Sequence, residues 1–143
     1  PTCLYAALQV HALRRAFSRA SMPLSLRYAM KANNSPALLK FLLSMGVGVD
    51  CVSPGEVYLA TGLGFAADAI LFTPFDISIA ELDEIPSRVT LNVGSIAVLE
   101  RLVSAGKSFF SLYRMTEYSY KLKILFMIYF SVGNFFRFYL RMT

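Results

Sequence analysis

The feature that most constrains the fold of this chain is a short apolar run that recurs about every twenty residues. Each run is only a few residues long and is rich in Val, Ile, Leu or aromatic residues, which is typical of a buried strand. The spacing leaves room for one helix between successive runs. The runs are residues 24–30, 47–52, 69–73 and 88–93.

The segments between the runs contain the signals that start and stop helices. Ser35-Pro36 places a capping hydroxyl before a first-turn proline. Ser53 and Glu56 have the spacing of a capping box, and Ser78 and Glu81 repeat it. A helical segment is also predicted ahead of the first run. This opening helix is predicted from about His11 to Ala20. The helix after the first run is predicted to end at Gly46, and the helix after the second run at Gly62 and Gly64. The helix after the fourth run is predicted from Ser95 to Gly106.

Short strands that alternate with helices predict an α/β fold with parallel strands joined by right-handed crossovers. A doubly wound open sheet and a (β/α)8 barrel both satisfy this pattern. No Gly-x-Gly-x-x-Gly follows the first run, which argues against a dinucleotide-binding domain. A whole barrel needs roughly 250 residues, so this chain supplies about half of one.

Charge and composition divide the chain at Gly106. Residues 1–106 hold eight basic and eight acidic residues, whereas residues 107–143 hold six basic residues against Glu117 alone. The net charge of +5 therefore belongs to the second part and does not indicate that the first part binds nucleic acid. Twelve of the twenty aromatic residues also lie in 107–143. We therefore predict a folded body, 1–106, and a basic aromatic-rich tail, 107–143.

The two cysteines, Cys3 and Cys51, are too few and too far apart to suggest a disulfide framework or a zinc site, and no metal is predicted. Cys51 lies in an apolar run and is interpreted as a small buried hydrophobe. No charged segment followed by an apolar one indicates a signal peptide. We expect a protein that is not secreted and is cytoplasmic, or plastid if it comes from a plant or alga.

A single lysine, Lys31, ends the first apolar run, after Tyr28, Ala29 and Met30. Lysine is usually solvated, and a lysine partly withdrawn from water is an amine that can form Schiff bases with carbonyl compounds. The alternative is a strand-end lysine whose stem packs while its ammonium group reaches water. Taken alone, the segment 28–33 favours this second interpretation.

Three segments together change that balance. Residues 28–33 (Tyr-Ala-Met-Lys-Ala-Asn), the leucine-rich segment 38–43 and residues 49–56 (Val-Asp-Cys-Val-Ser-Pro-Gly-Glu) resemble the N-terminal half of diaminopimelate decarboxylases. These belong to the alanine-racemase-like barrel family of pyridoxal 5'-phosphate (PLP) enzymes, together with ornithine and arginine decarboxylases. The resemblance covers roughly residues 1–106, although Pro1–Tyr5 is only a weak match to the strand before the barrel.

The resemblance implies a partial TIM (β/α)8 barrel of about four βα units with an atypical C-terminal tail. It implies PLP as cofactor and Lys31 as the Schiff-base lysine, at the strand end where such barrels keep catalytic groups. Asp50 matches the family's acidic residue near that lysine, where a carboxylate could stabilise or position the ammonium form. A strand carboxylate satisfied by backbone donors explains Asp50 nearly as well. Glu56 matches a family glutamate, but its capping box is a sufficient explanation.

The resemblance also implies an activity, the decarboxylation of a small amino acid. The first choice is meso-diaminopimelate in lysine biosynthesis, because Ala32 stands where ornithine decarboxylases tend to have cysteine. The alternatives are an ornithine or arginine decarboxylase-like enzyme, or a non-catalytic PLP-barrel protein that is truncated and inactive. If the barrel were complete, a family-like homodimer is expected.

The departures from the family lie at and beyond the fourth run. Gly94-Ser95 stands where the family usually has Asp-Ser, and the expected histidine, phosphate-binding loop and ring-nitrogen acid are not found after Gly106. We therefore interpret the tail as a replaced end. Its apolar run 124–136 is shorter than the roughly 20 residues that span a bilayer. Contact of the tail with a membrane surface is the less favoured alternative.

Overall fold

The structure is a computed structural model that describes residues 2–19, 24–93, 96–104, 112–114 and 138–142. Within these ranges six strands form one sheet in the order β5-β4-β3-β2-β1-β6. Strands β1 to β5 run parallel to their neighbours, and β6 is antiparallel to β1. The predicted α/β fold with parallel strands is confirmed. The strands are β1 Leu24–Ala29, β2 Gly48–Cys51, β3 Ile70–Phe72, β4 Thr90–Val93, β5 Leu112–Arg114 and β6 Phe138–Met142.

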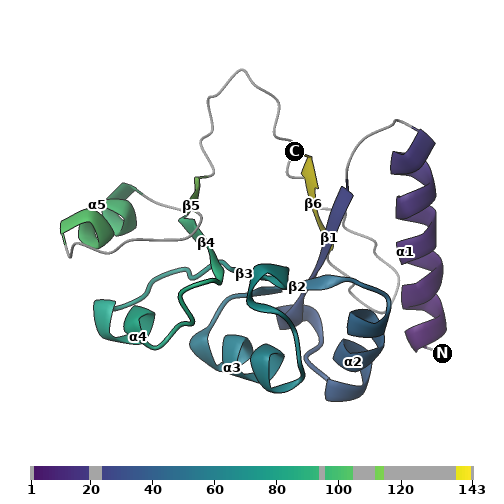
Figure 1. Cartoon of the computed structure of the whole chain (residues 1–143), viewed down its shortest axis with the longest axis horizontal. Helices are drawn as coiled ribbons and strands as arrows, with labels where there is room; N and C mark the ends of the chain where they lie inside the picture. The colour runs from purple at the N-terminus through teal and green to yellow at the C-terminus, as the bar shows by residue number, and fades with distance from the viewer. Residues whose placement is uncertain (1, 20–23, 94–95, 105–111, 115–137, 143) are drawn as a thin grey trace.

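One helix follows each of the strands β1 to β4, and a longer helix precedes β1. Figure 1 shows the helices in an arc outside the sheet, with α1 beside β1 at one end and α5 near β4 at the other. The helices are α1 Thr2–Arg19, α2 Pro36–Ser44, α3 Pro54–Gly62, α4 Ile79–Asp83 and α5 Ile96–Ser104, with short 3-10 turns η1 Met30–Ala32 and η2 Ala67–Ala69.

The strand register divides the sheet into two chemically different faces. Residues paired across neighbouring strands point to the same face, and the next residue along each strand points to the other. Tyr28, Val49 and Ile70 are paired in this way, and with Phe72 they pack with the helices in one apolar core. We call this the outer face. The opposite, inner face is marked by the paired residues Ala29, Asp50, Leu71 and Thr90.

The apolar core forms where the helices cover the outer face. Helix α2 contributes the buried residues Leu38, Leu39 and Leu42, which share one side of the helix because they lie three or four positions apart. Helix α3 contributes Val57 and Ala60 at the same kind of spacing. Each helix therefore supplies one apolar stripe to the outer face, as the sequence pattern predicts.

The helix signals are confirmed at some positions and differ at others. The Ser78–Glu81 capping box is complete. Ser35 precedes α2 as expected, but its hydroxyl makes no capping hydrogen bond. Gly46 takes a φ of 67° directly after α2, a backbone conformation that favours glycine. The predicted start at Ser95 lies outside the described residues.

The opening of the chain corrects one expectation. The weak match of Pro1–Tyr5 to a strand is wrong from Thr2 onward, because α1 already begins there and not near His11. The helix is long because apolar residues recur at helical spacing along one side. Ala6 and Val10 are fully buried members of the core, and Cys3, Leu13 and Phe17 pack against it.

The tail also contributes strands that the sequence analysis did not find. It detected no start of a fifth βα unit after Gly106, yet β5 continues the parallel series beside β4 with Leu91 paired to Leu112. Strand β6 pairs with β1 from Leu24 with Met142 to Tyr28 with Phe138. Both strands are short segments in an aromatic-rich sequence that lacks turn signals, so no periodicity marks them. The predicted division at Gly106 stays a prediction.

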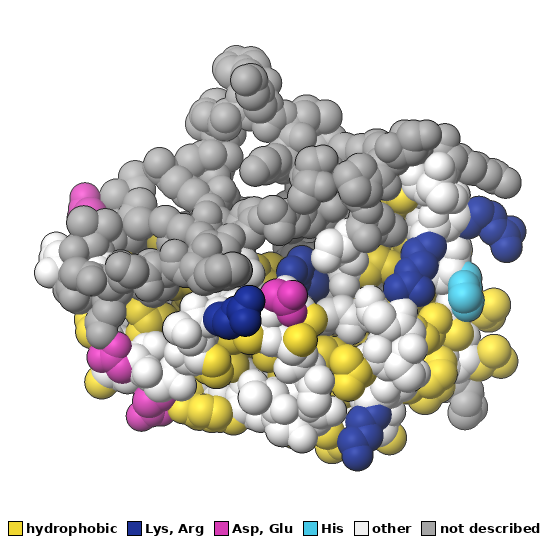
Figure 2. Space-filling model, viewed as in Figure 1, with side chains coloured by type: hydrophobic (Ala, Val, Ile, Leu, Met, Phe, Trp, Pro, Cys, Tyr) yellow, Lys and Arg dark blue, Asp and Glu magenta, His cyan; other side chains and the backbone are white. Residues whose placement is uncertain are grey.

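The surface charges are unevenly placed on the face seen in Figure 2. Lys and Arg side chains lie beside α1, in the middle and at the lower edge of this view, whereas most Asp and Glu side chains lie toward α4 and α5. Among the described residues, no helix combines the length and the apolar character needed to cross a bilayer. The tail run 124–136, for which membrane contact was considered, lies outside the described residues.

Candidate functional site

Lys31 lies in η1, the turn that follows β1 at the carboxyl end of the sheet. The three residues before it, Tyr28, Ala29 and Met30, are fully buried, whereas Lys31 is exposed. This exposure agrees with the alternative of a strand-end lysine whose ammonium group reaches water, and not with a lysine partly withdrawn from water. The chain turns out of the sheet at Met30, so the next side chain stands outside the packed core. Lys31 thus presents a primary amine that a carbonyl compound can reach from solvent.

Asp50 is placed on the inner face of the neighbouring strand. It is fully buried in β2 and is paired with Ala29, the residue two positions before Lys31. Burial of a carboxylate requires hydrogen-bond partners. The hydroxyl of Thr73 supplies one by donating to Asp50 Oδ1 at 2.7 Å. The structure therefore brings Lys31 and Asp50 to the same end of two adjacent strands, as the sequence predicts.

Two further polar residues join Asp50, and sequence reasoning missed both. Thr73 follows β3, and its hydroxyl oxygen accepts a hydrogen bond of 3.3 Å from Nδ2 of Asn92 in β4. Asn92 is only 6% exposed. A signal was present in the sequence, because each is a polar residue inside or directly after an apolar run. Thr90, two positions before Asn92, is a buried polar residue of the same face.

Glu56 and Cys51 belong to the structure around the site rather than to its chemistry. The carboxylate of Glu56 accepts a 2.7 Å hydrogen bond from the Val52 backbone N–H, one residue ahead of the expected capping-box partner. Burial raises the pKa of the Cys51 thiol above its ordinary value, and the negative charges of Glu56 and Asp50 raise it further. A thiol held protonated in this way is a poor nucleophile.

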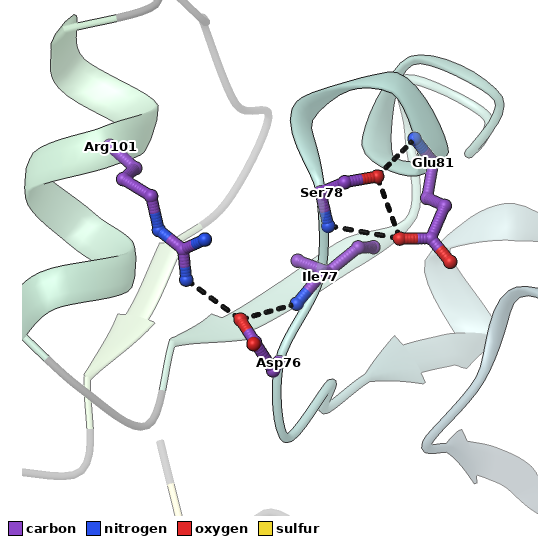
Figure 3. A network of polar contacts seen from close by, with 5 residues as sticks. All are labelled: Asp76, Ile77, Ser78, Glu81 and Arg101. Atoms are coloured by element: carbon purple, nitrogen blue, oxygen red, sulfur yellow. Dashed lines mark hydrogen bonds and ion pairs between the residues drawn. The ribbon is translucent and has the colours of Figure 1, made fainter.

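The connection from β3 to α4 forms the rim of the same strand ends (Figure 3). Asp76 accepts hydrogen bonds from Arg101 of α5 at 2.7 Å and from the Ile77 N–H at 3.0 Å. These contacts lower the pKa of the Asp76 carboxyl, the Arg101 hydrogen bond most of all. Ser78 and Glu81 then fix the first turn of α4. The rim is thus tied to α5 on one side and to α4 on the other.

A cavity of about 250 Å³ lies at the opposite, amino end of the strands. Arg27 and Gly48 line it, and Arg27 donates to the backbone oxygen of Asp68 at 3.1 Å. A Cβ at Gly48 would collide with the backbone oxygen of Ala69, so only glycine fits this close approach of β2 to the segment before β3. The cavity is separate from Lys31. In the described ranges no cluster of His, Cys, Asp and Glu is suited to a metal ion.

Comparison with known proteins agrees with this geometry. The family profile "Pyridoxal-dependent decarboxylase, pyridoxal binding domain" matches residues 8–124. A diaminopimelate decarboxylase of Methanothermobacter thermautotrophicus is 42% identical over 91 residues, which are 63% of this chain and 21% of that protein.

Two solved structures resemble the fold as well. The diaminopimelate decarboxylase of M. jannaschi has a TM-score of 0.60 and 25% identity, over 73% of this chain and 25% of that chain. The diaminopimelate decarboxylase of Helicobacter pylori complexed with L-lysine has a TM-score of 0.52 and 30% identity, over 58% of this chain and 23% of that chain. This chain therefore corresponds to about a quarter or less of each of these proteins.

By fold, the chain is a part of a β/α barrel, since the solved neighbours are barrel decarboxylases and its parallel strands and outer helices correspond to them. The predicted partial barrel is confirmed. With the profile matching most of its length, the chain belongs to the pyridoxal-dependent decarboxylases and contains a part of their pyridoxal-binding domain. The predicted relationship to diaminopimelate decarboxylases is likewise confirmed. The cofactor implied by this family is PLP.

The described residues fit such a cofactor in their donor chemistry. PLP has an aldehyde that a primary amine attacks, and the exposed Lys31 supplies the amine at the strand end. Asp50 adds a buried carboxylate on the next strand, fixed by Thr73. Both groups lie at the carboxyl end of the sheet, where barrel proteins assemble their sites.

Proposed function

We propose that this chain is the N-terminal part of the PLP-binding barrel of an amino-acid decarboxylase and that Lys31 holds the cofactor covalently. The observation that supports this most directly is the exposed amine of Lys31 at the end of β1 in a matched pyridoxal-binding domain. When bound, PLP supplies the electron sink for the electrons left behind as carbon dioxide departs.

The chain's own residues would position the cofactor and stabilise the charge at its point of attachment. Lys31 would hold the cofactor through its primary amine and so keep it at the end of β1. Asp50 provides a negative charge on the adjacent strand, which favours a cationic nitrogen at Lys31. Its burial keeps water away from that charge, and a charge acts more strongly where water is excluded.

The substrate we propose is a small amino acid, with meso-diaminopimelate as the first choice. The names of the relatives support this, since the Methanothermobacter, M. jannaschi and Helicobacter proteins are all diaminopimelate decarboxylases. L-lysine, bound in the Helicobacter structure, is what remains of diaminopimelate after one carboxyl group is lost. Ornithine and arginine are the alternative substrates of the same family.

The remaining features are proposed on the same basis. Residues 1–106 form the barrel part and 107–143 the tail. A complete barrel would need further strands, and the completed protein is proposed to form a homodimer. Both Cys3 and Cys51 are free thiols, which is compatible with the reducing cytoplasm that we propose as its location.

The test of the cofactor site is borohydride trapping on the 143-residue chain. PLP is added at low concentration, the product is reduced, and the labelled peptide is mapped. We expect the label at Lys31 and its loss in Lys31→Ala. Lys40 is the matched control, because it is also exposed and lies nearby in sequence on α2. Labelling that is equal at Lys40, or that survives Lys31→Ala, would overturn the assignment.

A second candidate function is PLP binding without decarboxylation. It is favoured by the small share of each relative that this chain matches, about a quarter or less. We expect the isolated chain to release no more carbon dioxide from meso-diaminopimelate than free PLP does, because a barrel part alone does not preorganise the whole cofactor. Release above that level that is lost in Lys31→Ala would show that the chain is itself an enzyme.

A further inference from the structure

The carboxyl ends of β2, β3 and β4 are joined by one chain of side-chain hydrogen bonds. Asn92 donates to Thr73 at 3.3 Å, and Thr73 donates to Asp50 at 2.7 Å. Each residue comes from a different strand or strand end, so the chain of bonds runs from strand to strand across the inner face. It reaches the carboxylate of Asp50, which lies beside β1.

The direction of these bonds follows from the atoms. A threonine hydroxyl has one hydrogen, and here it is donated to Asp50, so its oxygen is left to accept from Asn92. At Asp50 it is the carboxyl oxygen Oδ1 that accepts this hydrogen. The 2.7 Å bond to Asp50 has the usual length of an O–H···O hydrogen bond, whereas the 3.3 Å bond from Asn92 is longer than is usual for N–H···O.

The middle member is held in place independently of this chain. The backbone N–H of Thr73 donates to the oxygen of Cys51 at 2.7 Å, which ties the end of β3 to the end of β2. The β-branched side chain of threonine also has few allowed rotamers. Thr73 is therefore a rigid link, while Asp50 and Asn92 at its two ends are buried.

We propose that Thr73 and Asn92 are positioning residues that orient the Asp50 carboxylate toward the Lys31 end of the sheet, Asn92 acting only through Thr73. This rests on the proposed function, in which Asp50 stabilises the cofactor linkage at Lys31. Neither residue needs to touch the cofactor. Their effect is to fix the orientation of the carboxylate through its Oδ1 atom.

The test compares threonine variants in the full chain. Thr73→Val removes the hydroxyl at constant shape, and Thr73→Ser keeps it. Thr90→Val is the matched control, because Thr90 is a buried threonine of the same inner face. We expect Thr73→Val to weaken PLP capture at Lys31 about tenfold, the loss of one hydrogen bond to a charged group. Thr73→Ser should restore most of it, and Thr90→Val should leave it within about twofold.

A double-mutant cycle tests the order of the chain. If Asn92 acts only through Thr73, Asn92→Leu should weaken capture in the wild-type background and have no effect in the Thr73→Val background. Independent, additive effects of the two substitutions would overturn the proposed order. If Thr73→Val does not fold, as judged by its unfolding transition, the comparison of Thr73→Ser, Asn92→Leu and Thr90→Val decides in its place.

A measurement without PLP separates this proposal from the proposed function. The carbon NMR signal of the Asp50 carboxyl group, assigned with Asp50→Asn, should move in Asn92→Leu although Asn92 donates to Thr73 and not to Asp50. Thr90→Val should leave it unchanged. A signal that moves while Lys31 is never labelled would sink the cofactor role alone. A signal that ignores Asn92→Leu, with Lys31 labelled normally, would sink the positioning role alone.

Discussion

The two faces of the sheet are built from the same strands but obey different rules. Tyr28, Val49 and Phe72 on the outer face are fully buried against helices in a continuous apolar core. The inner face carries the buried Asp50 and Asn92 and the partly buried Thr73, and polar groups that are withdrawn from water require hydrogen bonds. The outer face therefore accounts for the stability of the fold, while the inner face holds the groups that can do chemistry. One residue along a strand is enough to pass from one role to the other.

The largest expected change in the free energy of unfolding tests this difference between the faces, and it comes from two neighbouring residues on opposite faces. Phe72 is fully buried on the outer face, and Leu71 before it is half-buried on the inner face. We expect Phe72→Ala to lower the free energy of unfolding by about 3–5 kcal/mol, the cost of a cavity in a packed core. Leu71→Ala should cost clearly less. Denaturant unfolding of the two variants checks this, and equal losses would mean that both faces contribute to the core alike.

The pH dependence of stability tests the outer face separately, because Tyr28 places a titratable phenol on this apolar face. Burial raises the pKa of Tyr28 to about 12, from 10.0. The unfolded chain loses this proton first, so the stability is complete below about pH 10 and falls as the pH rises toward 12. The expected loss is about 2–3 kcal/mol. Unfolding curves of Tyr28→Phe against wild type should differ in slope only in this alkaline range; parallel curves would contradict the burial of the phenol.

Polar contacts at the helix starts should matter less than either core residue. The Ser78 hydroxyl caps α4 as part of a complete capping box, whereas Ser35 precedes α2 without a side-chain cap. We expect Ser78→Ala to lower the free energy of unfolding by about 1 kcal/mol. Ser35→Ala should have little effect and serves as the matched control. Thermal unfolding of the two variants measures the difference. A larger loss of stability for Ser35→Ala than for Ser78→Ala would contradict the assignment of the side-chain cap to Ser78.

The outer face could be predicted from the sequence and the inner face only in part. Apolar runs and capping signals predicted strands β1 to β4 because they reflect burial and local hydrogen bonding, which short segments record. Lys31 was singled out by its place at the end of an apolar run, whereas its role and that of Asp50 came from the family resemblance. The exposure of Lys31 was one of two open interpretations, because it depends on the chain leaving the sheet at Met30.

The contacts that were missed are those that join distant segments. Thr73 and Asn92 are single polar residues whose partners lie on other strands, and no local pattern announces such a pairing. Strands β5 and β6 likewise gain their hydrogen bonds from β4 and β1, far away in sequence. Register across a sheet is set by the whole fold, so a scan along the chain does not reveal it.

The smallest expected effect concerns the rim, where Asp76 and Arg101 form an ion pair between the β3–α4 connection and α5. Both side chains are largely solvent-exposed, at 74% and 51%, so water and salt screen their attraction. The pair nevertheless holds the pKa of Asp76 below its ordinary value, mainly through the Arg101 hydrogen bond. A lowered pKa in the folded state means that the ion pair's contribution to stability is present above the ordinary pKa and is lost as the pH falls through the folded value.

We therefore expect Arg101→Gln to reduce slightly the slope of stability against pH in the acid range, at low salt only. Glu100→Gln, on the same helix, is the control for a change of charge without this ion pair. If Arg101→Gln destabilised the chain as much as Phe72→Ala, the rim would rank with the outer face, and the division between an apolar face that stabilises and polar contacts that orient would be wrong.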